Sequence, residues 1–137
     1  SANSGINITD VYFDVPVYGS DGAGDDTVDG GEGDDLIFGN GGDDSLTGGK
    51  GDDLLYGGDD ADVFHFDNGE GHDTIKDFEN NVDTLVIDRA LASGISDALD
   101  QGEIIGGNAV FDFGGGDVLT LRGIDNLDIL ANDLIIG

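Results

Sequence analysis

A nine-residue phrase repeats five times without a spacer between Asp21 and His65, and this repeat restricts the possible folds more than any other feature. The copies read DGAGDDTVD, GGEGDDLIF, GNGGDDSLT, GGKGDDLLY and GGDDADVFH. Each phrase concentrates glycine in its first four slots and places a large apolar residue in the eighth; the sixth slot is always aspartate. A fixed short period of this kind is typical of a parallel β-helix, in which each repeat stacks on its neighbours.

Each phrase divides into six turn residues and three strand residues. Glycine allows the positive φ angles that a tight turn needs, and the middle strand residue points opposite to its two neighbours. We predict that two phrases complete one coil, so that alternate phrases stack in the same sheet. The inward residues are then Val28, Leu46 and Phe64 in one sheet and Ile37 and Leu55 in the other. A core of one layer is too thin to be stable alone.

The flanks should therefore close the two ends of the roll. We expect an all-β fold: a parallel, right-handed β-roll with a C-terminal antiparallel β cap. Its three parts are N-terminal capping strands in 1–20, the roll in 21–78, and a β-sandwich-like cap in 79–137. The first part alternates apolar and polar residues from Ile6 to Val17, and Pro16 favours an edge strand there.

The C-terminal half contains less regular signals. Residues 66–78 keep a glycine-aspartate turn, two residues out of phase with the repeat. We predict a strand over Val82–Ile87 and a short helix over Arg89–Asp100, with Asp88 as its cap and Gly94 weakening it. Strands at 108–113 and 117–122 form a predicted hairpin across three glycines, and 131–137 gives a last strand.

The charge of the chain is extreme, with 31 acidic residues against 4 basic ones and a formal net charge of −27. Such self-repulsion opposes a compact state unless cations neutralise it. The composition alone is also compatible with an acidic disordered segment, but disorder does not require aspartates in a fixed register. A polyanion repels nucleic acids and anionic membranes, so we expect neither as a partner. The four cations, Lys50, Lys76, Arg89 and Arg122, are scattered along the sequence and suggest no patch.

The sixth-slot aspartates bring one carboxylate to every turn. Ca²⁺ takes about 6–8 oxygen ligands from carboxylates and backbone carbonyls, and sharp glycine turns expose carbonyls. Turns two phrases apart can share an ion, which gives two edges, with Asp26, Asp44 and Asp62 on one and Asp35 and Asp53 on the other. Mg²⁺ demands stricter geometry, zinc prefers nitrogen and sulfur, and the EF-hand spacing is absent.

Other polar residues have simpler interpretations. Aspartate and glycine are common turn formers, but five copies in one register are hard to explain that way. The fifth-slot aspartates Asp25, Asp34, Asp43 and Asp52 should face solvent. His65 and His72 are isolated, so we interpret them as strand or surface residues. No HExxH motif, cysteine nucleophile or serine–histidine motif is present, and we predict a non-catalytic chain.

These phrases, followed by GEGHDTIKDF, VDTLVI, FDFGGGDVLTLRGID and NDLIIG, resemble the RTX (repeats-in-toxin) modules of secreted bacterial proteins. The succession is similar to the C-terminal part of serralysin-type metalloproteases. The resemblance implies several calcium ions held between turns by sixth-slot aspartates and glycine-slot backbone oxygens. The residues at those positions are Gly22, Gly24, Asp26, Gly31, Gly33, Asp35, Gly42, Asp44, Gly49, Gly51, Asp53, Gly58 and Asp62, with Asp73 near the end of the roll. Asp21, Asn40 and Asp60 depart from the glycine pattern.

The resemblance also implies export by a type I ABC transporter and an extracellular location. Such exporters recognise an uncleaved C-terminal signal, and Asp133-Leu134-Ile135-Ile136 fits its pattern of one acidic residue followed by apolar ones, while also being compatible with a closing strand. Our leading hypothesis is a module that folds on extracellular Ca²⁺ and supports secretion of a larger exoprotein with an upstream passenger domain. The alternative is a polysaccharide-binding module, like the RTX modules attached to alginate-modifying epimerases.

Overall fold

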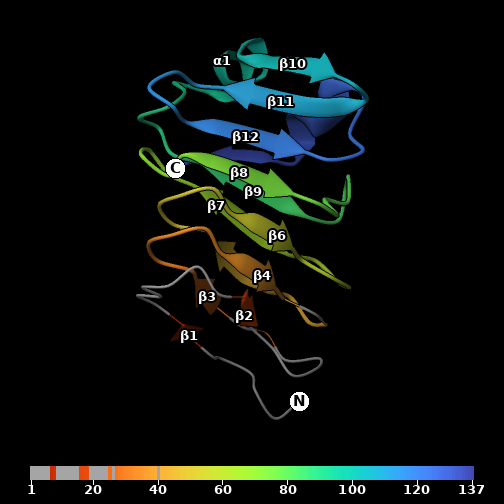
Figure 1. The fold of residues 1–137 in the computed structure, drawn as a ribbon. Helices are drawn as coiled ribbons and strands as arrows, with labels where there is room; N and C mark the ends of the chain where they lie inside the picture. Colours follow the sequence, from red (N-terminus) through yellow and green to blue (C-terminus); the bar gives the residue numbers. More distant parts are fainter. Residues whose placement is uncertain (1–6, 9–15, 19–24, 26, 40) are drawn as a thin grey trace.

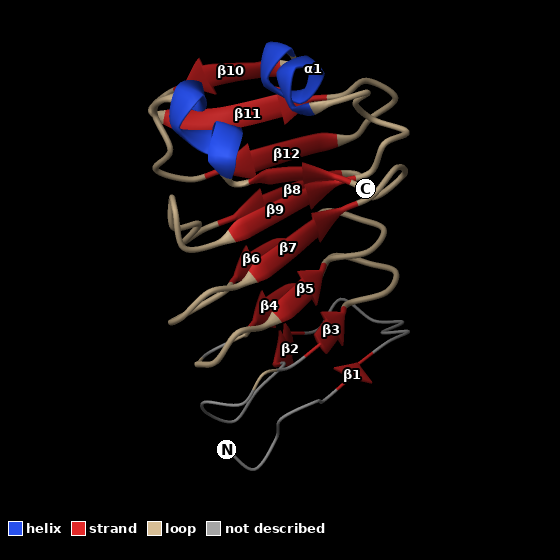
Figure 2. Ribbon diagram, turned by 180° about the vertical axis from the view of Figure 1, so that it is seen from behind, coloured by secondary structure: helices blue, strands red, loops and turns tan. Residues whose placement is uncertain are grey.

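The computed structural model describes residues 7–8, 16–18, 25, 27–39 and 41–137. Their strands form two facing sheets, and through the repeats the chain alternates between the sheets (Figures 1 and 2). The parallel sheet consists, in spatial order, of β1 (Asn7–Ile8), β3 (Thr27–Asp29), β5 (Ser45–Thr47), β7 (Val63–Phe66), β9 (Thr84–Ile87) and β13 (Leu134–Ile136). The mixed sheet consists of β10 (Gly102–Ile105), β11 (Asn108–Asp112), β12 (Val118–Leu121), β8 (His72–Ile75), β6 (Leu54–Tyr56), β4 (Leu36–Phe38) and β2 (Pro16–Tyr18).

The predicted stacking of alternate phrases is confirmed. Val28 pairs with Leu46 and Leu46 with Phe64 in the parallel sheet, whereas Ile37 pairs with Leu55 in the mixed sheet. All five side chains are buried. The architecture is therefore a parallel β-roll, and β2, which contains the proline expected at an edge, is the outermost described strand of the mixed sheet.

The roll continues beyond the five regular phrases. Ile75 pairs with Leu55 across twenty residues instead of eighteen, because two extra residues precede the glycine turn of this degenerate phrase. β9 then pairs in parallel with β7, with Leu85 opposite Phe64. The parallel ladder thus runs through Ile87, and the assignment of 79–137 as a separate cap stays a prediction.

The C-terminal cap differs from expectation at the helix. α1 covers only Ile95–Asp100, and its N-cap is Gly94 in an extended conformation. Asp88 instead caps the turn that follows it, accepting a hydrogen bond from the backbone N–H of Ala90 at 2.9 Å. The prediction over residues 89–100 was too long because glycine is a poor helix former, and the helix begins only after it.

The predicted hairpin is confirmed, and it gains a third strand. β11 pairs antiparallel with β12, and β10 adds to β11 through a two-residue turn at Gly106 and Gly107, both with positive φ. Two glycines between apolar runs are a strong hairpin signal. The 3-10 helix η1 (Leu127–Asn132) precedes β13, which pairs with β9, so the C-terminus lies beside the roll and not at its far end (Figure 1).

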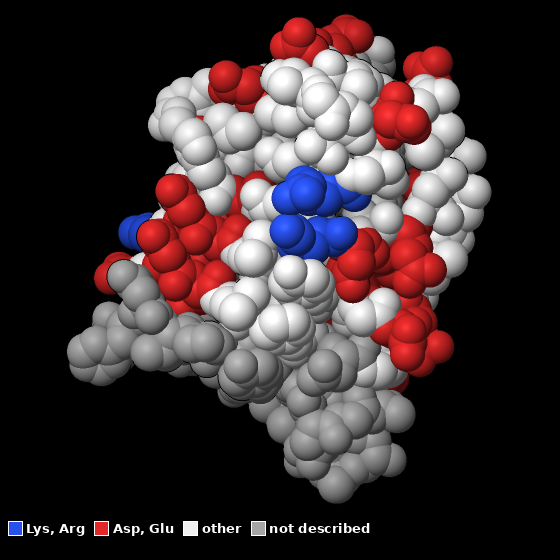
Figure 3. All heavy atoms as spheres, turned by 45° about the vertical axis from the view of Figure 1, so that its right-hand side comes forward, with Lys and Arg blue, Asp and Glu red and all other residues white. Residues whose placement is uncertain are grey.

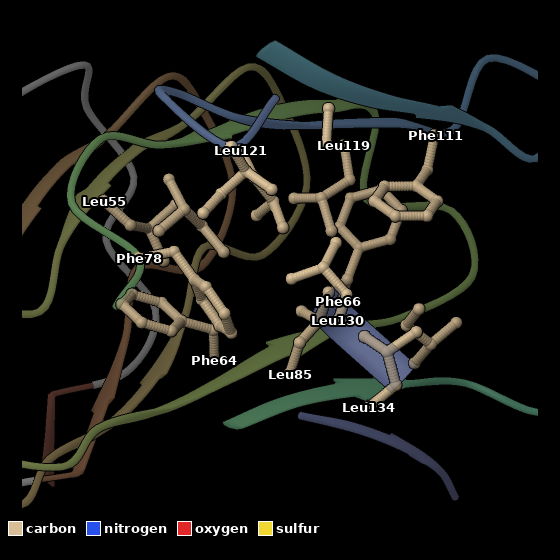
Figure 4. Close-up of a cluster of buried hydrophobic side chains, with 14 of the residues drawn as sticks. Leu55, Phe64, Phe66, Phe78, Leu85, Phe111, Leu119, Leu121, Leu130 and Leu134 are labelled. Carbon is tan, nitrogen blue, oxygen red and sulfur yellow. The ribbon is translucent and has the colours of Figure 1, made fainter. Parts of the chain in front are cut away.

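The core widens from the repeats toward the cap. In the regular phrases each strand buries one side chain, whereas the cap adds aromatic and leucine side chains between the sheets (Figure 4). Phe64 and Phe78 lie 6.0 Å apart between ring centroids, and Phe66 and Phe113 lie 5.9 Å apart. α1 and η1 cover the cap end of the mixed sheet on its inner side (Figure 2). Neither described helix has the length needed to cross a membrane.

Candidate metal centre

The turns of the roll stack directly on one another along its two edges. Gly49 has a φ of +88°, and the backbone N–H of Lys50 donates to the carbonyl of Gly31 at 2.9 Å. A Cβ on Gly49 would overlap that same carbonyl oxygen. Glycine is required here both for its conformation and for the close approach of the two turns.

The fourth slot of each phrase also requires a positive φ, both in the regular phrases and in the degenerate ones that follow. Gly33, Gly42, Gly51 and Gly71 have positive φ there. Asp60 (φ 71°) and Asn81 (φ 66°) fill the corresponding slots of less regular phrases and are the only described non-glycine residues with positive φ. Aspartate and asparagine tolerate this conformation better than other side chains do. The substitution at Asp60 therefore preserves the turn.

The sixth-slot aspartates form two buried columns, one along each edge. In the first, the backbone N–H of Asp44 donates to Oδ1 of Asp62 at 3.0 Å, and that of Asp62 donates to Oδ1 of Asp83 at 2.9 Å. In the second, the N–H of Asp35 donates to Oδ1 of Asp53 at 2.8 Å, and that of Asp53 to Oδ1 of Asp73 at 3.2 Å. All six aspartates are at most 3% exposed.

The second carboxylate oxygens lie close against the glycine turns. Within the described part of the chain, Oδ2 of Asp53 and Oδ2 of Asp62 are buried and receive no hydrogen bond. A Cβ built on Gly48 would lie 2.5 Å from Oδ2 of Asp53. A Cβ built on Gly30 would lie 2.6 Å both from Oδ2 of Asp35 and from the carbonyl oxygen of Gly48. Carboxylate and carbonyl oxygens therefore converge where only glycine fits.

Burial and mutual repulsion disfavour the charged form of these aspartates. Desolvation raises the pKa of Asp62 to about 8, and the neighbouring charges of Asp83, Asp44 and Asp77 add to the shift. Desolvation likewise raises the pKa of Asp83 to about 6, and burial raises the pKa of the Asp53–Asp73 pair. A buried anionic column of this kind requires protons or cations, because isolated charges are costly away from water.

The donor set fits a hard cation. It consists of oxygen alone, it includes buried carboxylate oxygens without a hydrogen-bond donor, and it alternates with backbone carbonyls, as Ca²⁺ prefers. Among the described residues, no three carboxylate or imidazole groups lie together as a side-chain-only metal site. Aspartates together with glycine-turn carbonyls would hold such ions, and ions bound along each edge would offset the charge of the column there.

The predicted ligands fall into two groups. Gly22, Gly24 and Asp26 lie outside the described residues. The structure places Asp35, Asp44, Asp53, Asp62 and Asp73 in the two columns and Gly31, Gly33, Gly42, Gly49, Gly51 and Gly58 in the turns between them. Their role as calcium ligands stays a prediction.

The fifth-slot aspartates face solvent, as expected, and they also join the turns. Oδ1 of Asp25 accepts from the N–H of Asp43 at 2.8 Å, and Oδ1 of Asp34 accepts from Asp52 at 2.8 Å. These exposed bonds run in the opposite sense to those of the buried columns, from a later N–H to an earlier carboxylate. This stabilising role was not anticipated from the sequence.

Sequence reasoning also missed the acidic residues that close the columns. Asp83 continues the first column, and Asp117 accepts hydrogen bonds from the N–H groups of Gly69 and Gly71. Asp133 accepts from Asn81, and the buried Glu70 accepts from Gly49. Asp73, Asp83 and Asp117 each precede a buried apolar residue by two positions, as in the regular phrases, so this spacing was a signal in the sequence. Of the three, only Asp83 lacks glycines in the turn before it.

Comparisons with known proteins support the repeat and the fold. A family profile described as RTX calcium-binding nonapeptide repeat (4 copies) matches residues 19–46 and 38–75. No individually curated protein matches the chain. Two of the solved structures that share the fold are subunits of the Azotobacter vinelandii mannuronan C5-epimerase. The AlgE6R3 subunit has a TM-score of 0.68 at 24% identity, covering 97% of this chain and 81% of that one. The AlgE6R2 subunit has a TM-score of 0.66 at 23% identity, covering 99% and 94%.

Proposed function

Because residues 19–75 belong to the RTX calcium-binding nonapeptide repeat family, we propose that this non-catalytic calcium-binding module folds when it meets extracellular Ca²⁺. The observation that carries the proposal is the pair of buried aspartate columns, whose members are almost wholly inaccessible to water. Without a cation, these carboxylates repel one another and the single-layer core of the repeats cannot offset the loss of backbone entropy. With Ca²⁺ between the turns, binding free energy becomes folding free energy.

The extracellular medium supplies Ca²⁺ at a concentration that can load such a module. Extracellular calcium modules have dissociation constants of ~10⁻⁴–10⁻³ M, which lie well above the calcium concentration of the cytosol. The same chain would then stay unfolded inside the cell and fold outside. We propose that this difference serves export through a type I ABC transporter, with the module supporting a passenger domain upstream in a larger bacterial exoprotein.

The C-terminal residues support this export hypothesis in a specific way. Leu134–Ile136 form β13, paired with β9, and Asp133 is 5% exposed with its carboxylate bonded to the N–H of Asn81. The folded module therefore buries Asp133 and Leu134 and pairs the backbone of the segment with β9, while Ile135 stays 52% exposed. We propose that the exporter reads this segment as an extended chain before it pairs, which low calcium before export and high calcium after export would allow.

Circular dichroism during a calcium titration tests the folding proposal. We expect a coil spectrum in excess EGTA, a β spectrum at millimolar Ca²⁺, and reversal by chelator. A spectrum already fully β in EGTA contradicts the proposal.

A neighbouring pair of aspartates tests the assignment of the ligands. Asp44→Ala should raise the calcium midpoint more than Asp43→Ala, because Asp44 is buried in a column and Asp43 is exposed. Equal effects would refute the assignment of the sixth slot.

Export has its own test. Co-expressed with a type I exporter, the intact chain should reach the medium, while a chain lacking residues 133–137 should stay inside the cell. Secretion of both chains would exclude this tail as the signal.

Polysaccharide binding is the second candidate function. It is supported by the source of the two structural neighbours, which are subunits of an epimerase that acts on mannuronan. Binding of glycans by the calcium-loaded chain, measured by isothermal titration calorimetry, tests it directly.

A further inference from the structure

A column of outward-facing side chains crosses the mixed sheet beside the buried column of Ile37, Leu55, Ile75 and Leu121. The residue after each of these inward positions is Phe38 on β4, Tyr56 on β6, Lys76 after β8 and Arg122 after β12. Phe38 pairs with Tyr56, and Ile75 pairs with both Leu55 and Leu121, which places the four following residues side by side. We call this set the ring–cation column.

The two aromatic rings form one end of the column. The ring centroids of Phe38 and Tyr56 lie 4.9 Å apart with an angle of 13° between the planes, so the rings are stacked. Both residues are only half-buried, although each is large and apolar. Leu36 and Leu54 pair next to them on the same outer face and are also half-buried. This end of the column therefore offers an apolar platform to a ligand.

The two cations form the other end. Lys76 donates its backbone N–H to Leu55, and Arg122 donates its backbone N–H to Ile75, which fixes them on neighbouring strands. They are half of the four cations in a chain of net charge −27, and neither forms an ion pair with a carboxylate of the described residues. Figure 3 shows adjoining basic side chains on this face, with acidic side chains on either side.

This arrangement corrects the expectation that the cations form no patch. Lys76 and Arg122 are far apart in sequence, and they become neighbours because β12 inserts next to β8 in parallel. Nothing in the local sequence around either residue indicates this pairing. Thr74 and Thr120 also pair across these two strands on the outer face, so hydroxyl groups lie beside the cations.

We propose that the ring–cation column binds a linear acidic polysaccharide, a uronate, when the roll is folded. Lysine and arginine pair with carboxylates, and arginine does so in a bidentate manner. Threonine hydroxyls can form hydrogen bonds with sugar hydroxyls, and aromatic faces can pack against the apolar C–H faces of sugar rings. Strands are ~4.8 Å apart, so four positions span roughly 14 Å. A ligand that reaches both ends is longer than one sugar, so an oligomer should bind more tightly than its monomer.

The inference gives the second candidate function its binding surface and rests on the calcium-dependent fold proposed above. Only the folded roll assembles the column, and the acidic turns beside it repel an anionic ligand until cations neutralise them. Binding of the uronate should therefore require Ca²⁺. Circular dichroism on each sample separates the two proposals, because failure to fold is visible there before any ligand is added.

Fluorescence anisotropy with a labelled oligomannuronate, at saturating Ca²⁺ and moderate salt, tests the proposal. Lys76→Gln and Arg122→Gln should each weaken binding about tenfold, the usual effect of losing one hydrogen bond to a charged group. Tyr56→Ala should weaken it severalfold while Tyr56→Phe should not. Free mannuronic acid, a neutral oligosaccharide and polyglutamate should compete poorly.

The chain supplies a matched control. Arg89→Gln removes one positive charge outside the column and should change binding less than twofold. Equal losses for Arg89→Gln and Arg122→Gln would show a mere net-charge effect and overturn the proposal. Binding that survives the Lys76→Gln/Arg122→Gln double substitution would place the uronate at the calcium turns instead. Equal binding of polyglutamate would reject the saccharide as the ligand. The four test variants are Lys76→Gln, Arg122→Gln, Tyr56→Ala and Tyr56→Phe, and if one of them fails to fold, the other three test the proposal.

Discussion

Replacing Asp62 by asparagine should destabilise the calcium-bound module but not the calcium-free one. Asp62 is 1% exposed, its Oδ1 accepts the N–H of Asp44, and its Oδ2 receives no hydrogen bond from the described residues. Asparagine keeps the shape of the side chain and an oxygen that can accept the same N–H group. The substitution therefore removes a charge from the column without leaving a cavity.

The magnitudes follow from what the carboxylate contacts in each state. In the calcium-bound state the loss of one charged ligand should cost about 1.5–3 kcal/mol, which raises the calcium midpoint by about 10- to 100-fold. In the calcium-free state the same charge is repelled by Asp83, Asp44 and Asp77, and burial already raises its pKa to about 8. Its removal should leave the residual β content in EGTA unchanged or increased.

Calcium titrations followed by circular dichroism, starting from EGTA, measure both quantities in one experiment. Asp59→Asn is the matched control, because Asp59 is exposed in the same turn and loses the same charge. Its calcium midpoint should shift less than about twofold, as expected for an exposed charge. An equal shift in both variants, or a wild-type midpoint in Asp62→Asn, would refute the assignment of the buried column as the calcium-binding element.

Three further predictions concern turns, core and pH. Gly49→Ala should destabilise the calcium-loaded roll strongly, since its Cβ overlaps a backbone carbonyl, whereas Gly115→Ala, with positive φ but open space, should cost only about 1–2 kcal/mol in urea unfolding. Phe111→Ala should lower the free energy of unfolding by about 3–5 kcal/mol, and Ile105→Ala, half exposed on β10, by about 0.5 kcal/mol or less. Lowering the pH from 8 to 4 in EGTA should increase β content by circular dichroism, because the folded chain binds a proton at Asp62 (pKa about 8) that the unfolded chain, with an ordinary value of 3.8, releases. Calcium affinity should fall over the same range, since protons and Ca²⁺ compete for one carboxylate; stability in EGTA that decreases toward pH 4 contradicts this scheme.

The repeat made the regular part of the roll predictable. A nine-residue period with a three-residue strand leaves one inward position per phrase, which is why the stacks of Val28, Leu46 and Phe64 and of Ile37 and Leu55 could be assigned. The sixth-slot aspartates share that register, so their two edges followed from the same reasoning. Where the glycines disappear, as before Asp83, the period was harder to see although the turn conformation persists at Asn81.

The cap was less predictable because its strands pair across long stretches of sequence. Propensity indicated the hairpin, but it overextended the helix before Gly94 and did not indicate β10. Acidic residues such as Asp117 and Asp133 have ordinary local contexts, and their role depends on which turn they reach after the chain has closed.

The sequence by itself determined the calcium-binding repeat, the parallel roll and the two aspartate edges, because all three depend on a local period that the backbone converts directly into position. Only the tertiary structure decided which residues end the columns and which cations become neighbours. Lys76 and Arg122 meet because β12 pairs with β8, and that choice depends on how the cap buries Phe111, Leu119 and Leu121. Burial of this kind is a property of the whole core, so no pattern around either cation could have indicated it.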